Sequence, residues 1–492
     1  MPSPQLSKVR AAAVDGRLAN PIYRQTQLKN LHDALSRETA RIEAAISNDN
    51  PDYHSVDVRL ETRLALRLLG EISTAVNPEQ ALKDEYSIAR GQDFASGRQP
   101  YGVVIIEEPA PHAFLYSLVS ALAPAIAEGN TVIVQMKGNS LLQTPALVFQ
   151  IVAAALDKDV FAVVHDELDS EDIGHRHLRV VQNGSTLSSS SPTTSRTPTL
   201  SSDPSARTVA IVERDADVQA AADALVAARF SLGGRSPYAP DLVLVNEWVK
   251  RDLIIALSAS SARFTADSIT ASKKGRKPAG SGKSSVAAKA VEEGSATIIS
   301  SNPEATIVDV SSRQSVVLRS KISEPCLVLH SVTSMDDAID TAPRHGTLAA
   351  TYVFSKPDPA KYIGQFVDTS IVFVNQIPLQ ILFGPMTPAT TSYNVALSTP
   401  YPTILFSLPK PQHIVPTVLS KTIASIMSNP HSTAVVLDPK ALPPVKRLKN
   451  RLALGFFEQG IVTGGVILLS VVLSCTGWVG WYAFRTAKAR LL

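Results

Sequence analysis

The sequence predicts an α/β protein with two parallel-sheet domains and a C-terminal helix that crosses a membrane. Residues 101–164 alternate short β-rich runs with apolar helical segments, and this order favours parallel strands with helices on both faces. Strand-like and helical runs return between residues 208 and 380. Residues 460–484 contain no charged side chain, which is typical of a membrane-spanning helix.

The first domain is predicted from periodicity and from turn residues. Leu28, Leu31 and Leu35 repeat at helical spacing within a helical region, 22–95. Proline and glycine turns then separate the shorter elements. Strands are expected at 101–106, 131–135 and 161–164, and helices at 115–127 and 144–156.

Composition changes divide the chain further. In residues 185–207, 17 of 23 side chains are Ser, Thr or Pro, which predicts a flexible stretch. We therefore expect a cofactor-domain-like segment over 1–207, which ends with this stretch, and a catalytic-domain-like segment over 208–380. A proline-rich return segment is expected over 381–459, and a transmembrane anchor over 460–484.

The C-terminal helix has the length and the flanks of an anchor. Twenty-five uncharged residues form a helix of roughly 37 Å, against about 30 Å of hydrocarbon. Trp478, Trp481 and Tyr482 lie near one end, where an aromatic belt is expected. Only eight residues follow, with Arg485, Lys488 and Arg490 among them, so the main domain is expected on the cytosolic side.

Charge and cysteine content exclude several function classes. Lys+Arg 47 against Asp+Glu 44 gives a net charge of +3, which is too balanced for a general nucleic-acid binder. The two cysteines, Cys326 and Cys475, exclude a disulfide scaffold and a cysteine-built zinc site. We expect no metal centre and no nucleic-acid partner.

Several stretches, in order, resemble the aldehyde dehydrogenase superfamily, and most closely its class 3 or fatty aldehyde dehydrogenase branch. The resemblance is carried by Pro100-Tyr-Gly-Val-Val-Ile-Ile106, Ala127-Glu-Gly-Asn-Thr-Val-Ile-Val134, Asn183-Gly-Ser-Thr186, Val209-Ala-Ile-Val-Glu-Arg-Asp-Ala-Asp217, Ala239-Pro-Asp-Leu-Val-Leu-Val245, Tyr352-Val-Phe-Ser355 and Val372-Phe-Val-Asn375. It implies a Rossmann-like cofactor domain, a second α/β domain, NAD or NADP as cofactor, and a homodimer.

The resemblance also implies a covalent chemistry. In the family a cysteine thiolate attacks the aldehyde, a hydride passes to NAD(P), and water releases the acid. The nucleophile precedes the A-P-D motif, which here reads Gly234-Arg-Ser-Pro-Tyr-Ala-Pro-Asp241. Pro237 stands in the cysteine position, and a proline carries no nucleophile.

The remaining catalytic and cofactor positions depart from the family pattern as well. Asp203 matches the general base and is one methylene shorter, and His112 falls near the oxyanion asparagine. Gln135 occupies the ribose-binding lysine position, with Lys137 two residues later. The other residues matched to cofactor positions are Gly184, Ser185 and Glu324.

Two functions are consistent with this pattern. The first is a membrane-anchored aldehyde dehydrogenase-like protein that lacks the family's oxidation and works by binding or as a partner subunit. The second is an NAD(P)-dependent oxidoreductase that oxidises lipophilic aldehydes at an altered site.

The basic C-terminal tail is compatible with endoplasmic reticulum, peroxisomal or mitochondrial outer membranes, and the resemblance favours the endoplasmic reticulum.

Overall fold

The computed structural model describes residues 4–136, 142–166, 168, 173, 176–184, 198–271, 285–302, 304–342, 347–388, 399–428, 442 and 456–491. The chain divides into two compact units, residues 1–415 and 416–492. The α/β class is confirmed, with two sheets in the first unit. The finer domain boundaries near residues 207, 380 and 459 stay predictions.

The first sheet contains five parallel strands in the order β4-β3-β2-β5-β6. These strands are β2 (Val103–Glu107), β3 (Thr131–Gln135), β4 (Phe161–Val164), β5 (His177–Val181) and β6 (Thr199–Ser201). Every residue of β2 and β3 is buried, because helices cover both faces of a parallel sheet. The predicted bounds of β3 and β4 match the observed strands.

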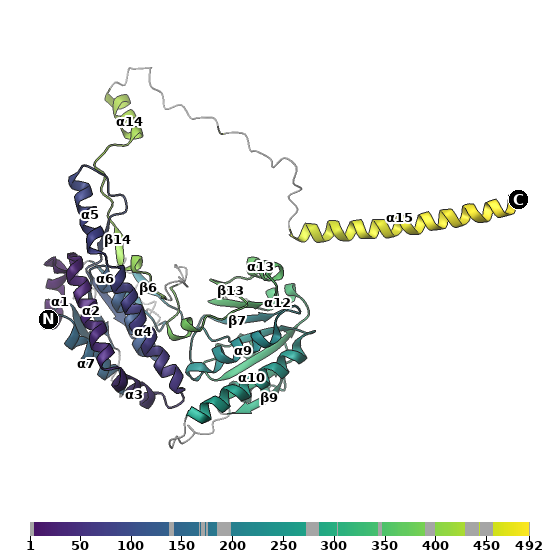
Figure 1. Cartoon of the computed structure of the whole chain (residues 1–492), viewed down its shortest axis with the longest axis horizontal. Helices are drawn as coiled ribbons and strands as arrows, with labels where there is room; N and C mark the ends of the chain where they lie inside the picture. The colour runs from purple at the N-terminus through teal and green to yellow at the C-terminus, as the bar shows by residue number, and fades with distance from the viewer. Residues whose placement is uncertain are drawn as a thin grey trace. The chain divides into compact units, whose positions relative to one another are not determined.

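Helices of the N-terminal half lie around the first sheet, except α5, which extends away from it and buries no residue (Figure 1). They are α1 (Pro4–Val14), α2 (Pro21–Arg37), α3 (Thr39–Asp49), α4 (Ser55–Ala75), α5 (Pro78–Ala89), α6 (Phe114–Ala127) and α7 (Gln143–Ala155). All 14 residues of α6 are buried, since α4 and α2 pack on it from the outside. α6 is therefore the core helix of this domain.

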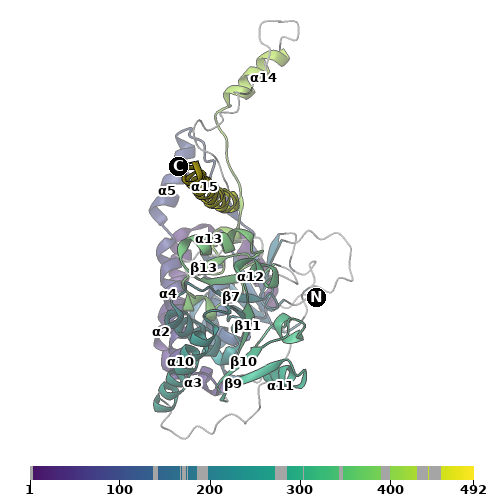
Figure 2. The ribbon, with the colours of Figure 1, turned by 90° about the vertical axis from the view of Figure 1, so that its right-hand side faces the viewer.

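The second sheet has seven strands in the order β13-β12-β7-β8-β11-β10-β9. The labelled strands of this sheet, β13, β7, β11, β10 and β9, follow one another in this order in Figure 2. All neighbours are parallel except β9 and β10. Its strands are β7 (Thr208–Val212), β8 (Leu242–Asn246), β9 (Ala296–Asn302), β10 (Ala305–Val310), β11 (Cys326–Val332), β12 (Ala350–Phe354) and β13 (Val372–Val374).

The helices of the second domain are α9 (Val218–Phe230), α10 (Lys250–Ala271), α11 (Ser285–Glu292), α12 (Met335–Thr341) and α13 (Pro357–Phe366). After this domain the chain returns to the first one. β14 (Ser407–Pro409) pairs antiparallel with β1 (Arg98–Pro100), and the Asn130 side chain donates to the Phe406 carbonyl at 2.9 Å.

The second unit contains α14 (Val418–Ser428) and α15 (Phe456–Leu491). Within α15, Gln459–Thr486 is long and apolar enough to cross a membrane, and none of it is buried. The predicted anchor over 460–484 lies inside this helix. The structure thus shows one helix that is able to cross a membrane by its length and composition.

The prediction of a flexible stretch over 185–207 is wrong for its last part. Residues 185–197 lie outside the described residues, but residues 199–201 form β6 on the edge of the first sheet. Leu200 is buried, and the Ser202 hydroxyl lies 3.0 Å from the Tyr401 hydroxyl. Composition predicted flexibility because it carries no information about these distant partners.

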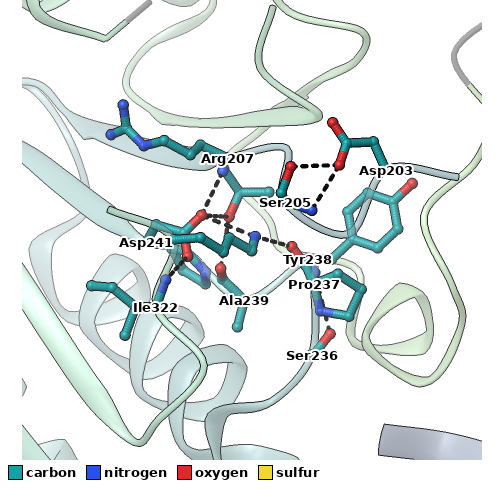
Figure 3. Close-up of polar contacts among 12 residues, drawn as sticks. Asp203, Ser205, Arg207, Ser236, Pro237, Tyr238, Ala239, Asp241 and Ile322 are labelled. Atoms are coloured by element: carbon teal, nitrogen blue, oxygen red, sulfur yellow. Dashed lines mark hydrogen bonds and ion pairs between the residues drawn. The ribbon is translucent and has the colours of Figure 1, made fainter. Parts of the chain in front are cut away.

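A buried ionic cluster ties the second sheet to the loop that precedes β8. The Asp241 carboxylate accepts from the Thr208 amide at 2.8 Å and from the Ile322 amide at 3.0 Å (Figure 3). Lys321 Nζ lies 3.0 Å from the same carboxylate, and Arg229 lies 3.8 Å from it. The side chains of Asp241 and Arg229 have no exposed surface. The Asp241 carboxylate therefore compensates the buried positive charge of Arg229.

Removing the charge of Asp241 is therefore expected to destabilise the fold. Asp241→Asn leaves two buried cations without their counter-ion, which typically costs about 3–5 kcal/mol. The measurement is the guanidinium unfolding midpoint of the full chain in detergent. The matched control is Asp33→Asn, which breaks an exposed ion pair with Lys29 and should leave the midpoint nearly unchanged. Equal midpoints for the two variants would contradict the role given to Asp241.

Candidate functional site

A cavity of about 440 Å³ lies where the two domains meet, and it brings together two of the predicted positions, His112 and Pro237. Loops that follow strands of the first sheet form one wall, in agreement with the rule that ligands bind at the carboxyl ends of parallel strands. The loop before β8 and the segment before β11 form the other wall. The remaining side chains that line the cavity include Asn50, Gln182, Asn183, Arg235, Lys321, Pro385 and Met386.

Pro237, the residue predicted in the nucleophile position, offers no reactive group to this cavity. Pro237 lines the wall with its ring, and its carbonyl accepts from Lys321 Nζ at 2.5 Å. The neighbouring Ser236 is buried, and its hydroxyl accepts from the Tyr238 amide at 3.3 Å. Cys326 is buried at the start of β11 and is not among the residues that line this cavity, and Cys475 lies in α15, in the second unit.

The backbone before Pro237 is held by close packing. Gly233 and Gly234 have positive φ values of 59° and 71°. A Cβ on Gly234 would lie 2.5 Å from the Glu324 carbonyl, so only glycine fits there. The loop is therefore a rigid turn that presents proline to the cavity.

His112 is a poor hydrogen-bond donor toward the cavity. Burial lowers the pKa of its imidazole to about 4, so the ring is neutral near pH 7 and carries one N–H. Nε2 lies 3.2 Å from the Gly384 carbonyl, and the backbone of Leu382 is a second partner of the ring. Carbonyl groups only accept, so the N–H on Nε2 is directed at Gly384 in the tautomer that satisfies this contact. The other ring nitrogen of this tautomer is an acceptor and cannot stabilise an oxyanion.

Asp203 lies on a different cavity from His112 and Pro237. It lines a space of about 340 Å³ together with Tyr238 and Thr387. Its Oδ1 accepts from the Ser205 amide at 2.9 Å and from the Ser205 hydroxyl at 2.6 Å (Figure 3). The carboxylate thus caps its own loop, and the structure does not bring it to the wall formed by Pro237.

The positions predicted to hold the cofactor are committed to internal contacts where the structure describes them. Gln135 is buried, and its amide donates to the Asp166 carbonyl at 3.2 Å. The Glu324 carboxylate accepts from the Val286 amide at 2.7 Å and from the Ser285 amide at 3.1 Å. Glu324 therefore caps the N-terminus of α11. Lys137 and Ser185 lie outside the described residues.

The turn at Gly184 is in close contact with a neighbouring side chain, Pro204. Its φ is +56°, and a Cβ there would lie 2.7 Å from Cδ of Pro204. Pro204 thus packs against the turn that in the family faces the nicotinamide. Together with the committed side chains of Gln135 and Glu324, this contact means that the described residues do not fit a dinucleotide held in the family manner.

Sequence reasoning missed the cations of the cavity. Arg235 is held at its rim by Asp52 at 2.5 Å and by the Asn50 side chain at 2.9 Å, and it lies over the Tyr53 ring. Lys321 lines the wall, and burial lowers the pKa of its ammonium group. No sequence motif marked either residue, although Lys321 lies only three positions before Glu324.

A buried acid borders a second, smaller cavity of about 140 Å³ that shares His112 and Asn183 with the first. Glu61, on α4, accepts from the Leu115 amide at 2.9 Å at the start of α6. Burial raises the pKa of its carboxyl to about 8, although the amides of Leu115 and Tyr116 lower it. The side chain is therefore largely protonated near pH 7.

Among the described residues, no group of three His, Cys, Asp or Glu side chains could hold a metal ion.

Solved structures share this arrangement of domains. Aldehyde dehydrogenase AldH of Staphylococcus aureus superimposes with a TM-score of 0.65 at 18% identity, over 84% of this chain and 94% of that chain. An NAD-dependent benzaldehyde dehydrogenase from Corynebacterium glutamicum gives a TM-score of 0.61 at 15% identity, over 84% and 88%. The fold is therefore that of two-domain aldehyde dehydrogenases.

The family model described as the aldehyde dehydrogenase family matches residues 6–384, so this chain belongs to the aldehyde dehydrogenase family. Similar curated proteins include aldehyde dehydrogenase family 3 member B1 of Rattus norvegicus, 26% identical over 72% of this chain and 78% of the relative. Family 3 member A2 of Mus musculus is 24% identical over 74% and 77%. The 4,4'-diaponeurosporen-aldehyde dehydrogenase of Staphylococcus aureus is 25% identical over 54% and 60%.

The raised pKa of Glu61 predicts a pH-dependent stability. The native state binds a proton that the unfolded state releases above its ordinary value of 4.5. The free energy of unfolding should therefore fall as the pH rises from 4.5 to about 8, by up to about 1.4 kcal/mol per pH unit. Glu61→Gln keeps the size and the acceptor, so this variant should lose that slope in guanidinium unfolding.

The matched control for this experiment is Glu71→Gln, on the same helix but in an exposed pair with Arg67. This control should keep the wild-type pH profile. A profile of Glu61→Gln that is parallel to wild type would contradict a protonated Glu61 in the native state.

Proposed function

We propose that this aldehyde dehydrogenase family protein is anchored in a membrane, has lost the family's aldehyde oxidation, and uses its interdomain cavity to bind a ligand or a partner. The observation that carries the proposal is Pro237, which lines the cavity in the nucleophile position. Formation of an acyl-enzyme requires a thiolate at that place.

The surroundings of Pro237 support the loss of catalysis. A proline has no N–H, so the donor that the family takes from the nucleophile's own backbone is absent too. Removing one oxyanion donor typically costs on the order of 10²–10³ in rate. The N–H of His112 is committed to Gly384, and Asp203 is committed to Ser205. Nucleophile, oxyanion donor and base are thus all unlike the family.

The alternative is NAD(P)-dependent oxidation of lipophilic aldehydes at an altered site. The open cavity of about 440 Å³ favours it, as does the similarity to named aldehyde dehydrogenases. The internal contacts of Gln135 and Glu324, two residues predicted to hold the cofactor, favour the first function over this alternative. By family resemblance, the same proposal includes a homodimer and a main domain on the cytosolic side of the membrane. It favours the endoplasmic reticulum membrane over the peroxisomal and mitochondrial outer membranes.

Turnover distinguishes the two functions. The full chain, reconstituted in vesicles, is mixed with a long-chain aldehyde and NAD or NADP, and the absorbance of the reduced cofactor is followed. We expect no steady-state production of reduced cofactor, because no thiol lines the cavity wall at Pro237. Ordinary turnover would overturn the proposal in favour of the alternative. Cofactor binding without turnover would agree with a binding role.

Restoring the thiol alone should not restore activity. Pro237→Cys leaves His112, Asp203 and Gln135 unlike the family, so we expect slow alkylation by iodoacetamide and no steady-state turnover. The background is Cys475→Ser, in which the remaining Cys326 is buried. The matched control is Pro385→Cys, which lines the same cavity away from the nucleophile position. Robust turnover by Pro237→Cys would show that the rest of the site is intact.

Deleting residues 460–492 should release the protein from membranes into the soluble fraction, because this deletion removes most of the apolar helix Gln459–Thr486. The measurement is the distribution of the protein after extraction at alkaline pH, with the full chain as control. Retention of the shortened chain in the alkaline pellet would show that a different segment is embedded in the bilayer.

A further inference from the structure

The short helix α14 has one apolar and one polar face. At 3.6 residues per turn, its larger apolar side chains share one half of the surface, namely Val418, Leu419, Ile423, Ile426 and Met427. The opposite half carries Ser420, Lys421, Ala424, Ser425 and Ser428. This division is typical of a helix that lies between an apolar and an aqueous phase.

The apolar face of α14 is exposed. The structure buries no side chain of this helix, and Val418, Leu419 and Met427 are 84%, 56% and 76% exposed. A helix of a soluble domain would place such a face on the core. The helix is nevertheless well defined at its start, since the Thr417 hydroxyl accepts from the Ser420 amide at 3.1 Å.

The place of α14 in the chain keeps it close to the membrane. The Asp93 carboxylate binds the amides of Ile414 and Val415 at 2.6 and 3.0 Å, so the folded body ends three residues before α14 begins. Residues 429–455 separate α14 from α15, and they span at most about 90 Å when fully extended. A chain held by α15 therefore presents α14 to the same bilayer at high effective concentration.

Charge indicates which lipid surface suits this helix. The sequence contains no acidic residue from Thr399 to Leu437, and Lys421 is the only charged residue of α14. The sequence of 429–455 contains five basic residues and one acidic residue, Asp438. Basic residues next to a membrane helix are attracted to anionic lipid headgroups.

We propose that α14 lies in the headgroup region of an anionic bilayer, on the side that faces the folded body, with its apolar face among the acyl chains. The helix is then a second, interfacial contact with the membrane that α15 crosses. This inference rests on the proposed anchor, and it is independent of whether the cavity oxidises aldehydes.

The test measures which face of α14 enters the lipid, in the full chain reconstituted in vesicles of phosphatidylcholine with phosphatidylserine. Single cysteines are introduced in the Cys475→Ser background and carry a nitroxide label. Leu419→Cys and Ile423→Cys report on the apolar face, and Ser420→Cys and Ser428→Cys are the matched controls on the polar face. Power saturation compares collisions with oxygen, which concentrates in lipid, and with a water-soluble nickel chelate.

We expect labels at 419 and 423 to collide preferentially with oxygen, and labels at 420 and 428 to collide preferentially with the nickel chelate. In phosphatidylcholine alone this contrast should diminish. Equal access of the chelate to all four labels would overturn the proposal, because the helix would then lie in water. Poor access of both reagents at 419 and 423 would also overturn the proposal, because the apolar face would then pack on protein. A contrast that does not depend on phosphatidylserine would overturn the role of anionic lipid.

A second variant pair and a flotation control separate this proposal from that of the anchor. Ile426→Asp places a charge on the apolar face and should abolish the contrast, whereas Ser425→Asp on the polar face should leave it. If the full chain fails to float with the vesicles, the anchor and the interfacial helix are both wrong. If it floats without any difference between the two faces, only the interfacial helix is wrong.

Discussion

The buried Asp241 carboxylate is the interaction on which the second domain and the cavity wall both depend. It joins the start of β7, the loop before β8 and the segment at Lys321–Ile322 through hydrogen bonds and ion pairs. Lys321 extends this cluster to the carbonyl of Pro237. The residue predicted in the nucleophile position is therefore fixed by the same charges that stabilise the fold.

The cavity between the domains does not depend on the side chains predicted to be catalytic. The domains still meet around an open space, since their packing depends on buried strands and on α6 rather than on catalytic side chains. The polar residues at the family positions have meanwhile found internal partners. Glu324 caps α11, and His112 binds the Gly384 carbonyl. Both contacts are internal to the folded chain.

Membrane attachment involves a physical problem different from that of the folded body. α15 satisfies its backbone hydrogen bonds internally and exposes apolar side chains, which water disfavours and lipid accepts. α14 is too short to cross a bilayer and has a polar face, and an interface between lipid and water accommodates both of its sides. The two helices therefore occupy different depths of one membrane in the proposal made above.

The sequence alone determined the fold class, the central strands, the apolar C-terminal helix and the proline that precedes the A-P-D motif. These features are local, because a buried parallel strand is a continuous apolar run and a proline cannot carry a thiol wherever it lies. Tertiary structure alone decided that Asp203 and His112 line separate cavities, that Glu324 caps a helix whose first residue, Ser285, lies 39 positions away, and that residues 199–201 form a strand. Hydrogen bonds between distant segments settle these points, and the spacing of residues along the chain does not encode such partners.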